Sequence, residues 1–121
     1  MSRDHAKLAF FTIADELALR VYLITQAFPA HERYGLQSQL RRAAVSAVTN
    51  IVEGATRRSG KAYMQFLEIS LGSACEARYL LQLCVRLKLL GEDEAKPLVA
   101  SYTTVIKAVQ ATITTIAADS R

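Results

Sequence analysis

The chain has 121 residues, a net charge of +4, 51% hydrophobic residues, no Trp, five Gly and two Pro. This length suits one domain with a single core, and the composition excludes a disordered chain and favours a helical one. No apolar run reaches the roughly 18 residues of a membrane span, and the first residues lack the pattern of a secretory signal. We therefore expect a single cytoplasmic domain over residues 1–121, with no membrane partner.

The first two apolar segments predict helices over about residues 10–28 and 36–55. In the first, apolar residues recur at steps of three or four, as on one helix face, and Pro29 ends the pattern. The second carries the small residues Ala43, Ala44 and Ala47 on its apolar face, which would let a neighbouring helix approach closely. Gly54 closes that pattern, and the turn GATRRSGK follows.

The last two segments predict helices over about residues 61–90 and 95–117. Gly91 ends the third helix, and the fourth places Pro97 in its first turn, after three acidic residues. The β-branched stretches TTVIKAV and TITTI favour a strand locally. Because apolar residues keep helical spacing over about five turns there, we predict a helix.

Four helices with short connections predict an all-α, antiparallel, up-down-up-down four-helix bundle. Extra apolar residues lie roughly 100° from the main apolar face of the second helix (Val45 and Val52) and of the third (Leu67 and Leu71). Apolar surface on a second face usually marks a subunit contact. These four residues are therefore predicted to contact other copies in a homo-oligomer, with a monomer as the alternative.

A polar stripe flanks the apolar face of the second helix. Its members lie within about 60° of one another on a helical wheel: Gln39, Ser46, Asn50, Glu53 and Arg57. Glu76 lies near the edge of the apolar face of the third helix. Three interpretations of the stripe are open. It is a solvated helix edge, or it is a partly buried polar seam that fixes helix register or subunit contacts. The third is a catalytic site in which Glu53 and Glu76 act as paired carboxylates.

Chemistry-bearing motifs are absent from the sequence. No nucleophile or base accompanies Glu53 and Glu76 at a supporting spacing, so we predict no catalytic residue and no enzyme. Glu-x-x-His pairs, which a di-iron or di-manganese bundle needs, do not occur, and neither do CxxC, GxGxxG or GxxxxGK[ST] motifs. We expect no metal, no cofactor and no small-molecule substrate.

Positive charge is concentrated in residues 33–61, which hold six basic residues and one acid, whereas the rest of the chain holds nine basic and ten acidic residues. Phosphate contact with RNA or DNA is the hypothesis for five of these basic residues: Arg41, Arg42, Arg57, Arg58 and Lys61. Aromatic residues are not interleaved with the arginines, so no base-stacking platform is evident. The alternative is that the arginines are solvated or form salt bridges between subunits.

Residues 28–77 resemble the four-helix bundle proteins first noticed in intervening sequences of bacterial 23S ribosomal RNA genes, the 23S rRNA-intervening sequence protein family. The resemblance is carried by residues that match the family pattern in order: Phe28, Pro29, Glu32, Tyr34, Gly35, Leu36, Gln39, Leu40, Arg41, Arg42, Ala43, Ser46, Asn50, Ile51, Glu53, Gly54, Arg57, Ser59, Phe66, Leu67, Gly72, Ser73 and Glu76. With weaker flanks it covers about Leu17 to Gly91.

The resemblance implies a cytosolic four-helix bundle that assembles as a ring-like homopentamer, and it implies no settled activity. A related group, the accessory variability proteins of diversity-generating retroelements, is similar in bundle and pentamer and binds nucleic acid and a reverse transcriptase through a basic surface. We therefore expect a non-enzymatic, oligomeric adaptor that contacts RNA or DNA through the second helix and the following turn. The alternative is a protein-interaction or structural scaffold without nucleic-acid binding.

Overall fold

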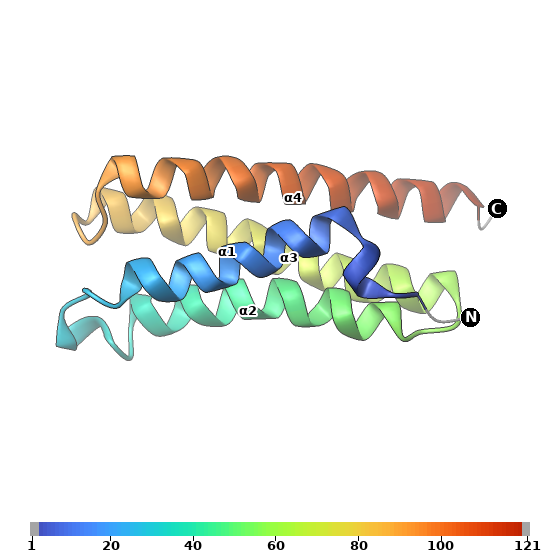
Figure 1. The fold of residues 1–121 in the computed structure, drawn as a ribbon, viewed down its shortest axis with the longest axis horizontal. Helices are drawn as coiled ribbons and strands as arrows, with labels where there is room; N and C mark the ends of the chain where they lie inside the picture. Colours follow the sequence, from blue (N-terminus) through green and yellow to red (C-terminus); the bar gives the residue numbers. More distant parts are fainter. Residues whose placement is uncertain (1–2, 120–121) are drawn as a thin grey trace.

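The computed structural model describes residues 3–119, which form four α-helices, two short 3-10 helices and no strand. The α-helices are α1 (Ala9–Thr25), α2 (Leu36–Ala55), α3 (Gly60–Arg86) and α4 (Glu92–Asp119), and the 3-10 helices are His5–Lys7 and Ala30–Glu32. The four α-helices lie side by side along the long axis (Figure 1). The α1–α2 and α3–α4 connections lie at one end, and the α2–α3 turn and the end of α4 lie at the other (Figure 1). The all-α prediction is confirmed.

The core lies between the four helices and draws on one apolar face of each. α2 and α4 each contact both α1 and α3. Leu40, Leu81 and Tyr102 are fully buried in this core, and Leu17 is 4% exposed. Burying each such side chain contributes roughly 1.5–3 kcal/mol, so the apolar periodicity of the sequence supplies most of the force that holds the bundle together.

Small residues let α2 and α3 approach closely. Ala43 and Ala47 are buried on the face of α2 that meets α3. Near the end of α2, a Cβ added to Gly54 would lie 2.9 Å from the Cβ of Phe66, closer than real Cβ contacts allow. The small residues of α2 therefore let α3 pack closely against it, as the sequence predicted.

Three helix ends lie three or four residues from the predicted boundaries. α1 ends at Thr25 rather than near residue 28, and side chains of α2 bind the carbonyl groups at its end: Gln37 Nε2 donates to Thr25 O (2.8 Å). α3 ends at Arg86 rather than near residue 90, because Lys88 takes a left-handed conformation (φ 63°) and Leu89 N donates back to Cys84 O (2.8 Å). This turn returns Leu90 to the core.

α4 begins at Glu92, three residues before the predicted start. The Gly91 N–H donates to the Glu94 carboxylate (3.3 Å), which caps the helix in the manner of a capping box. Pro97 consequently lies beyond the first turn, where its ring leaves the Asp93 carbonyl without the usual donor. Asp93 is an exposed residue, so this break in the hydrogen-bond ladder lies on the solvent side of α4 rather than in the core.

The β-branched stretch of α4 is helical, as the apolar spacing predicted. Several threonine hydroxyls donate to the carbonyl oxygen four residues earlier, including Thr103 to Val99 (3.1 Å) and Thr112 to Ala108 (3.0 Å). Tyr102, Val105 and Val109 face the core between them. Burial of one face thus outweighs the local preference of these residues for strands.

Leu67 was predicted to contact another subunit, and this prediction is wrong, because Leu67 is 0% exposed and belongs to the core of a single chain. The buried arc of α3 is wider than one stripe, since the helix packs against both α2 and α4. Leu71, on the same side, is partly buried against the core. Val45 and Val52 on α2 are partly exposed. The sequence alone could not show whether this apolar face of α3 is covered by another helix of the same chain or by another subunit.

Candidate functional site

Arg41 turns toward α1 and is occupied there. Its Nε donates to Thr25 Oγ1 (2.9 Å), its Nη2 donates to Tyr22 O (3.1 Å), and its guanidinium lies 4.4 Å from the centroid of the Tyr22 ring. The positive charge thus meets the carbonyl end of α1, where the helix dipole is negative. Within residues 3–119, Arg41 serves to join α1 to α2 and offers little of its guanidinium to a phosphate.

Arg57 is half buried at the other end of α2. Its Nη2 lies 3.2 Å from Glu53 Oε1, and its guanidinium lies 4.6 Å from the centroid of the Phe66 ring. The side chains of Arg57 and Glu53 are 42% and 55% exposed, so this ion pair contributes at most about 0.5 kcal/mol. Arg57 is therefore held in place by ring stacking as well as by charge.

The turn after α2 gathers further positive charge. Arg58 and Lys61 are exposed and form no ion pair within the described residues. Arg3 joins them from the start of the chain: its backbone N–H donates to Ala55 O (2.7 Å) and its Nη1 donates to Arg57 O (3.1 Å). We call Arg3, Arg57, Arg58 and Lys61 the basic turn surface. Sequence reasoning missed Arg3, because 54 residues separate it from Arg57 and no spacing pattern connects them.

Arg3 also stacks on an aromatic ring beside the basic turn surface. Its guanidinium lies 3.9 Å from the centroid of the Tyr63 ring. Burial raises the pKa of the Tyr63 phenol above its ordinary value, and the positive charge of Arg3 partly opposes that rise. Tyr63 therefore stays neutral at physiological pH and acts as a platform for Arg3.

The five predicted phosphate-contacting residues do not form one patch on a single chain. Arg42 lies 13 positions before the end of α2 at Ala55, which corresponds to about 20 Å along the helix, and Arg58 lies beyond that end. Arg42 is exposed near the start of α2, whereas Arg57, Arg58 and Lys61 lie around the α2–α3 turn. The sequence places them in one basic segment, but the length of α2 separates them into two locations.

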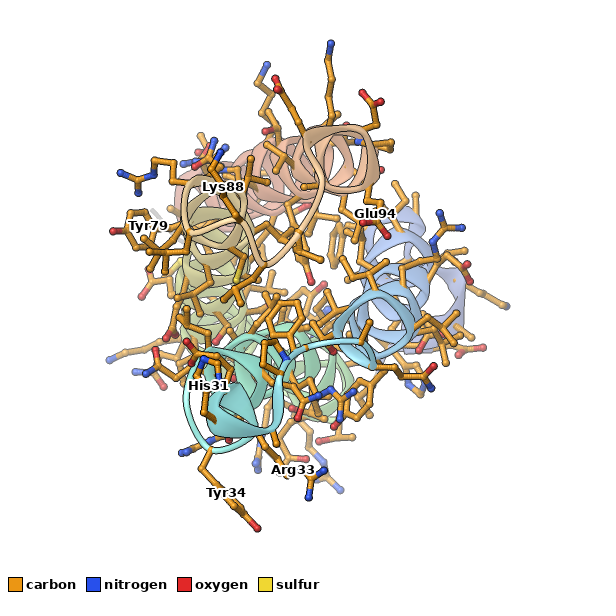
Figure 2. All side chains as sticks on the ribbon, turned by 90° about the vertical axis from the view of Figure 1, so that its left-hand side faces the viewer. His31, Arg33, Tyr34, Tyr79, Lys88 and Glu94 are labelled. Carbon is orange, nitrogen blue, oxygen red and sulfur yellow. The ribbon has the colours of Figure 1, made fainter. Side chains whose placement is uncertain are left out.

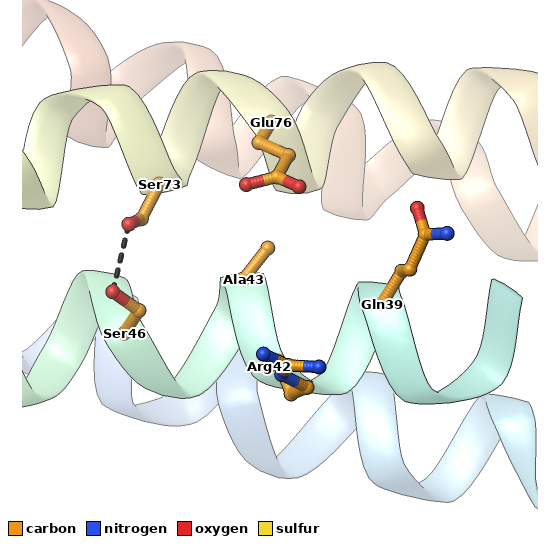
Figure 3. A pocket seen from close by; sticks show the side chains of 6 residues that line it. All are labelled: Gln39, Arg42, Ala43, Ser46, Ser73 and Glu76. Atoms are coloured by element: carbon orange, nitrogen blue, oxygen red, sulfur yellow. Dashed lines mark hydrogen bonds between the residues drawn. The ribbon is translucent and has the colours of Figure 1, made fainter. Parts of the chain in front are cut away.

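The predicted polar stripe faces α3 and is partly satisfied. The hydroxyls of Ser46 and Ser73 share a hydrogen bond of 2.8 Å across the two helices (Figure 3). Asn50 Nδ2 donates to Ser46 O (2.9 Å) and to Ser46 Oγ (3.1 Å). Glu53 pairs with Arg57. The stripe therefore contains a hydrogen-bonded seam at its centre.

Beside this seam, α2 and α3 enclose an open hollow of about 350 Å³ (Figure 3). Its lining residues are Gln39, Arg42, Ala43, Ser46, Ser73 and Glu76. The Glu76 carboxylate extends over Ala43 toward α2 (Figure 3). Glu76 makes no hydrogen bond or ion pair with any residue in 3–119, so it does not join the seam with Asn50, Glu53 and Arg57.

The opposite end of the bundle exposes an aromatic residue. Tyr34 is 91% exposed and extends outward beside Arg33, on the connection between α1 and α2 (Figure 2). His31 lies on the same connection, and Lys88 marks the neighbouring α3–α4 turn (Figure 2). Because α2 separates this end from the basic turn surface, Tyr34 does not supply a stacking platform for Arg57, Arg58 and Lys61.

None of the helices in residues 3–119 is long and apolar enough to cross a membrane. In the same part of the chain, no three His, Cys, Asp or Glu side chains are grouped so that they could hold a metal ion.

Comparisons with known proteins agree with this architecture. A solved crystal structure, described as a protein with unknown function from the S23 ribosomal protein family of Bacteroides thetaiotaomicron, matches with a TM-score of 0.78 and 21% identity. The match covers 87% of this chain and 98% of that chain, and at this identity it shows a shared fold. The comparison with curated proteins gives no match. A family model described as 23S rRNA-intervening sequence protein matches residues 6–111, and the chain therefore belongs to this family.

Proposed function

We propose that this protein is a non-enzymatic, homo-oligomeric adaptor of the cytoplasm that binds the phosphate backbone of RNA or DNA. Its subunit is an antiparallel up-down-up-down bundle, and the homopentamer implied by the family resemblance is part of the proposal. Binding occurs at the basic turn surface. The observation that carries the proposal is the gathering of Arg3, Arg57, Arg58 and Lys61 around one turn, where Arg58 and Lys61 are exposed and unpaired within the described residues.

The geometry of the turn favours contact with phosphates. Arg3 and Arg57 are each stacked on an aromatic ring, so less side-chain entropy is lost when they meet a ligand. The turn precedes α3, whose N-terminus carries partial positive charge, and Ser59 Oγ caps it by accepting from Ala62 N (3.0 Å). Phosphate contacts of this kind position a nucleic acid without reading its sequence.

Fluorescence anisotropy tests the proposal with the whole protein and labelled 20-mer duplexes and single strands of RNA and DNA. We expect binding at about 50 mM salt that weakens steeply toward about 200 mM, because counterion release drives contact with phosphates. We also expect affinities that differ little between sequences. Failure of every probe to bind at the lowest salt would overturn the proposal.

A second candidate is a protein-interaction scaffold without nucleic-acid binding. Large apolar side chains on the surface favour it: Leu19 and Leu23 on α1 are 58% and 60% exposed, and Ile69 and Tyr79 on α3 are 52% and 53% exposed. In this case Arg41 and Glu53 support assembly. Light scattering separates the candidates: the scaffold predicts a changed oligomer mass in Arg41→Ala or Glu53→Ala, and an unchanged mass in both counts against it.

A further inference from the structure

The hollow between α2 and α3 has the size of a small-ligand site. Its volume of about 350 Å³ lies at the lower end of the range of small-molecule pockets. Ala43 forms its floor, and the absence of a longer side chain at that position leaves the space open (Figure 3).

Two opposite charges border this hollow without meeting. Arg42 comes from α2 and Glu76 from α3, and they form no ion pair with each other or with any other residue in 3–119. Gln39, beside them, also has no hydrogen bond from its side-chain amide to the described residues. Glu53 in the last turn of α2 and Arg57 just beyond the helix end, by contrast, do pair. Among the described residues, the hollow is therefore lined by an unpaired guanidinium, an unpaired carboxylate and a free side-chain amide.

The other end of the hollow is fixed. The hydroxyls of Ser46 and Ser73 share a hydrogen bond of 2.8 Å, and Asn50 Nδ2 donates to Ser46 Oγ. These bonds hold α2 and α3 at a set separation, so the space between Arg42 and Glu76 is kept without a ligand. Because the hollow is already formed, a ligand that binds its free charged groups causes little further loss of conformational entropy.

The charges select the ligand class. A phosphate or another simple anion would pair with Arg42 but would be repelled by Glu76. A simple cation would pair with Glu76 but would be repelled by Arg42. An ion with both charges on neighbouring carbons satisfies both residues, since a guanidinium binds a carboxylate through two parallel hydrogen bonds and a carboxylate accepts from an ammonium. We propose that the α2–α3 hollow binds a free α-amino acid, with its carboxylate on Arg42 and its ammonium on Glu76.

This inference goes beyond the proposed nucleic-acid contact and revises the sequence-based expectation that no small molecule is bound. The two sites are distinct, because Arg42 lies about 20 Å along α2 from the helix end at Ala55, and Arg58 lies in the turn beyond that end. Variants of one site therefore leave the other intact, and the two proposals fail or succeed separately.

Isothermal titration calorimetry and amide NMR chemical shifts test the site with a panel of the free L-amino acids. Acetate and methylammonium, which carry only one of the two charges each, are the control ligands. We expect at least one amino acid to bind at least about tenfold more tightly than either single-charge probe. Arg42→Gln and Glu76→Gln should each weaken that binding about tenfold or more, because each removes one charge-assisted contact. Arg58→Gln is the matched control and should bind the amino acid as the unmodified protein does.

Both tested residues are exposed, so the variants should fold, and circular dichroism checks this. Absence of shifts in residues of the hollow at about 10 mM of every amino acid would overturn the proposal. Equal binding of acetate and the amino acid would overturn it as well. If neither variant binds differently but both change the mass of the assembly, the hollow is an interface between copies and the amino-acid site is disproved.

Discussion

Ser70 on α3 donates a hydrogen bond of 2.6 Å to the carbonyl oxygen of Ala47 on α2, and both residues are fully buried. The bond crosses between two helices that small residues hold close together. It lies on the floor of the same α2–α3 contact that carries the Ser46–Ser73 pair nearer the surface. This contact joins the two helices that border the hollow.

Replacing Ser70 with Ala should lower the free energy of unfolding by about 1 kcal/mol. The loss is modest because the Ala47 carbonyl keeps its place in the helical hydrogen-bond ladder and the cavity left by one oxygen is small. Urea denaturation measures it. Ser101→Ala on α4, a partly exposed serine without a side-chain hydrogen bond in the described residues, is the matched control and should change stability by less than about 0.5 kcal/mol.

Two glycines should respond with opposite signs to the same substitution. Gly54→Ala should destabilise the protein by roughly 1–3 kcal/mol, because the new Cβ would lie 2.9 Å from Phe66 Cβ and 3.2 Å from Tyr63 Cδ1. Gly72→Ala on α3 meets no atom within 4 Å and should stabilise it by about 0.5–1 kcal/mol through helix propensity. Thermal unfolding of the two variants checks both. Equal effects would contradict the close approach of α2 and α3.

Stability should fall as pH rises above 9, in part because of Cys84. Burial, and to a lesser extent the charge of Glu32, raises the pKa of the Cys84 thiol from 9.0 to about 11. Above pH 9 the unfolded chain loses a proton that the folded chain keeps until about pH 11, so the contribution is complete below pH 9 and declines through this window. The decline is at most about 1.4 kcal/mol per pH unit.

Urea denaturation at a series of pH values measures this slope. Cys84→Ala should show a shallower decline between pH 9 and 11 than the unmodified protein, while the two curves run parallel between pH 7 and 8. Identical slopes above pH 9 would show that the thiol ionises equally easily in both states, contrary to its full burial.

The sequence predicts the positions of the helices well, but it predicts less well which helix or subunit packs against each helix face. The predicted and observed bounds of α2 agree at both ends, because apolar spacing starts at Leu36 and small residues close it at Gly54 and Ala55. Leu67 was misassigned because one sequence shows which side chains are apolar but not which partner covers them. α3 packs against both α2 and α4, and Leu67 belongs to the core that the helices of one chain share.

The site was predicted in part. Periodicity placed Ser46, Asn50 and Glu53 on one stripe, and the structure joins all three of them to the partners described above. Periodicity could not show that Arg41 bends back to α1, since Thr25 lies 16 residues earlier. Nor could it bring Arg3 to the α2–α3 turn. Contacts between distant parts of the chain depend on the packing of helices, which single-helix patterns do not encode.

The most direct measurement of the central claim is the dependence of nucleic-acid affinity on salt in two double variants of equal charge. Arg58→Gln with Lys61→Gln removes two cations from the basic turn surface, and Lys96→Gln with Lys107→Gln removes two exposed cations from α4. For a DNA duplex, we predict that the first variant lowers the slope of log affinity against log salt by about 0.9 for each lost phosphate contact, and that the second leaves the slope unchanged. Equal slopes for the two variants would contradict binding at the basic turn surface.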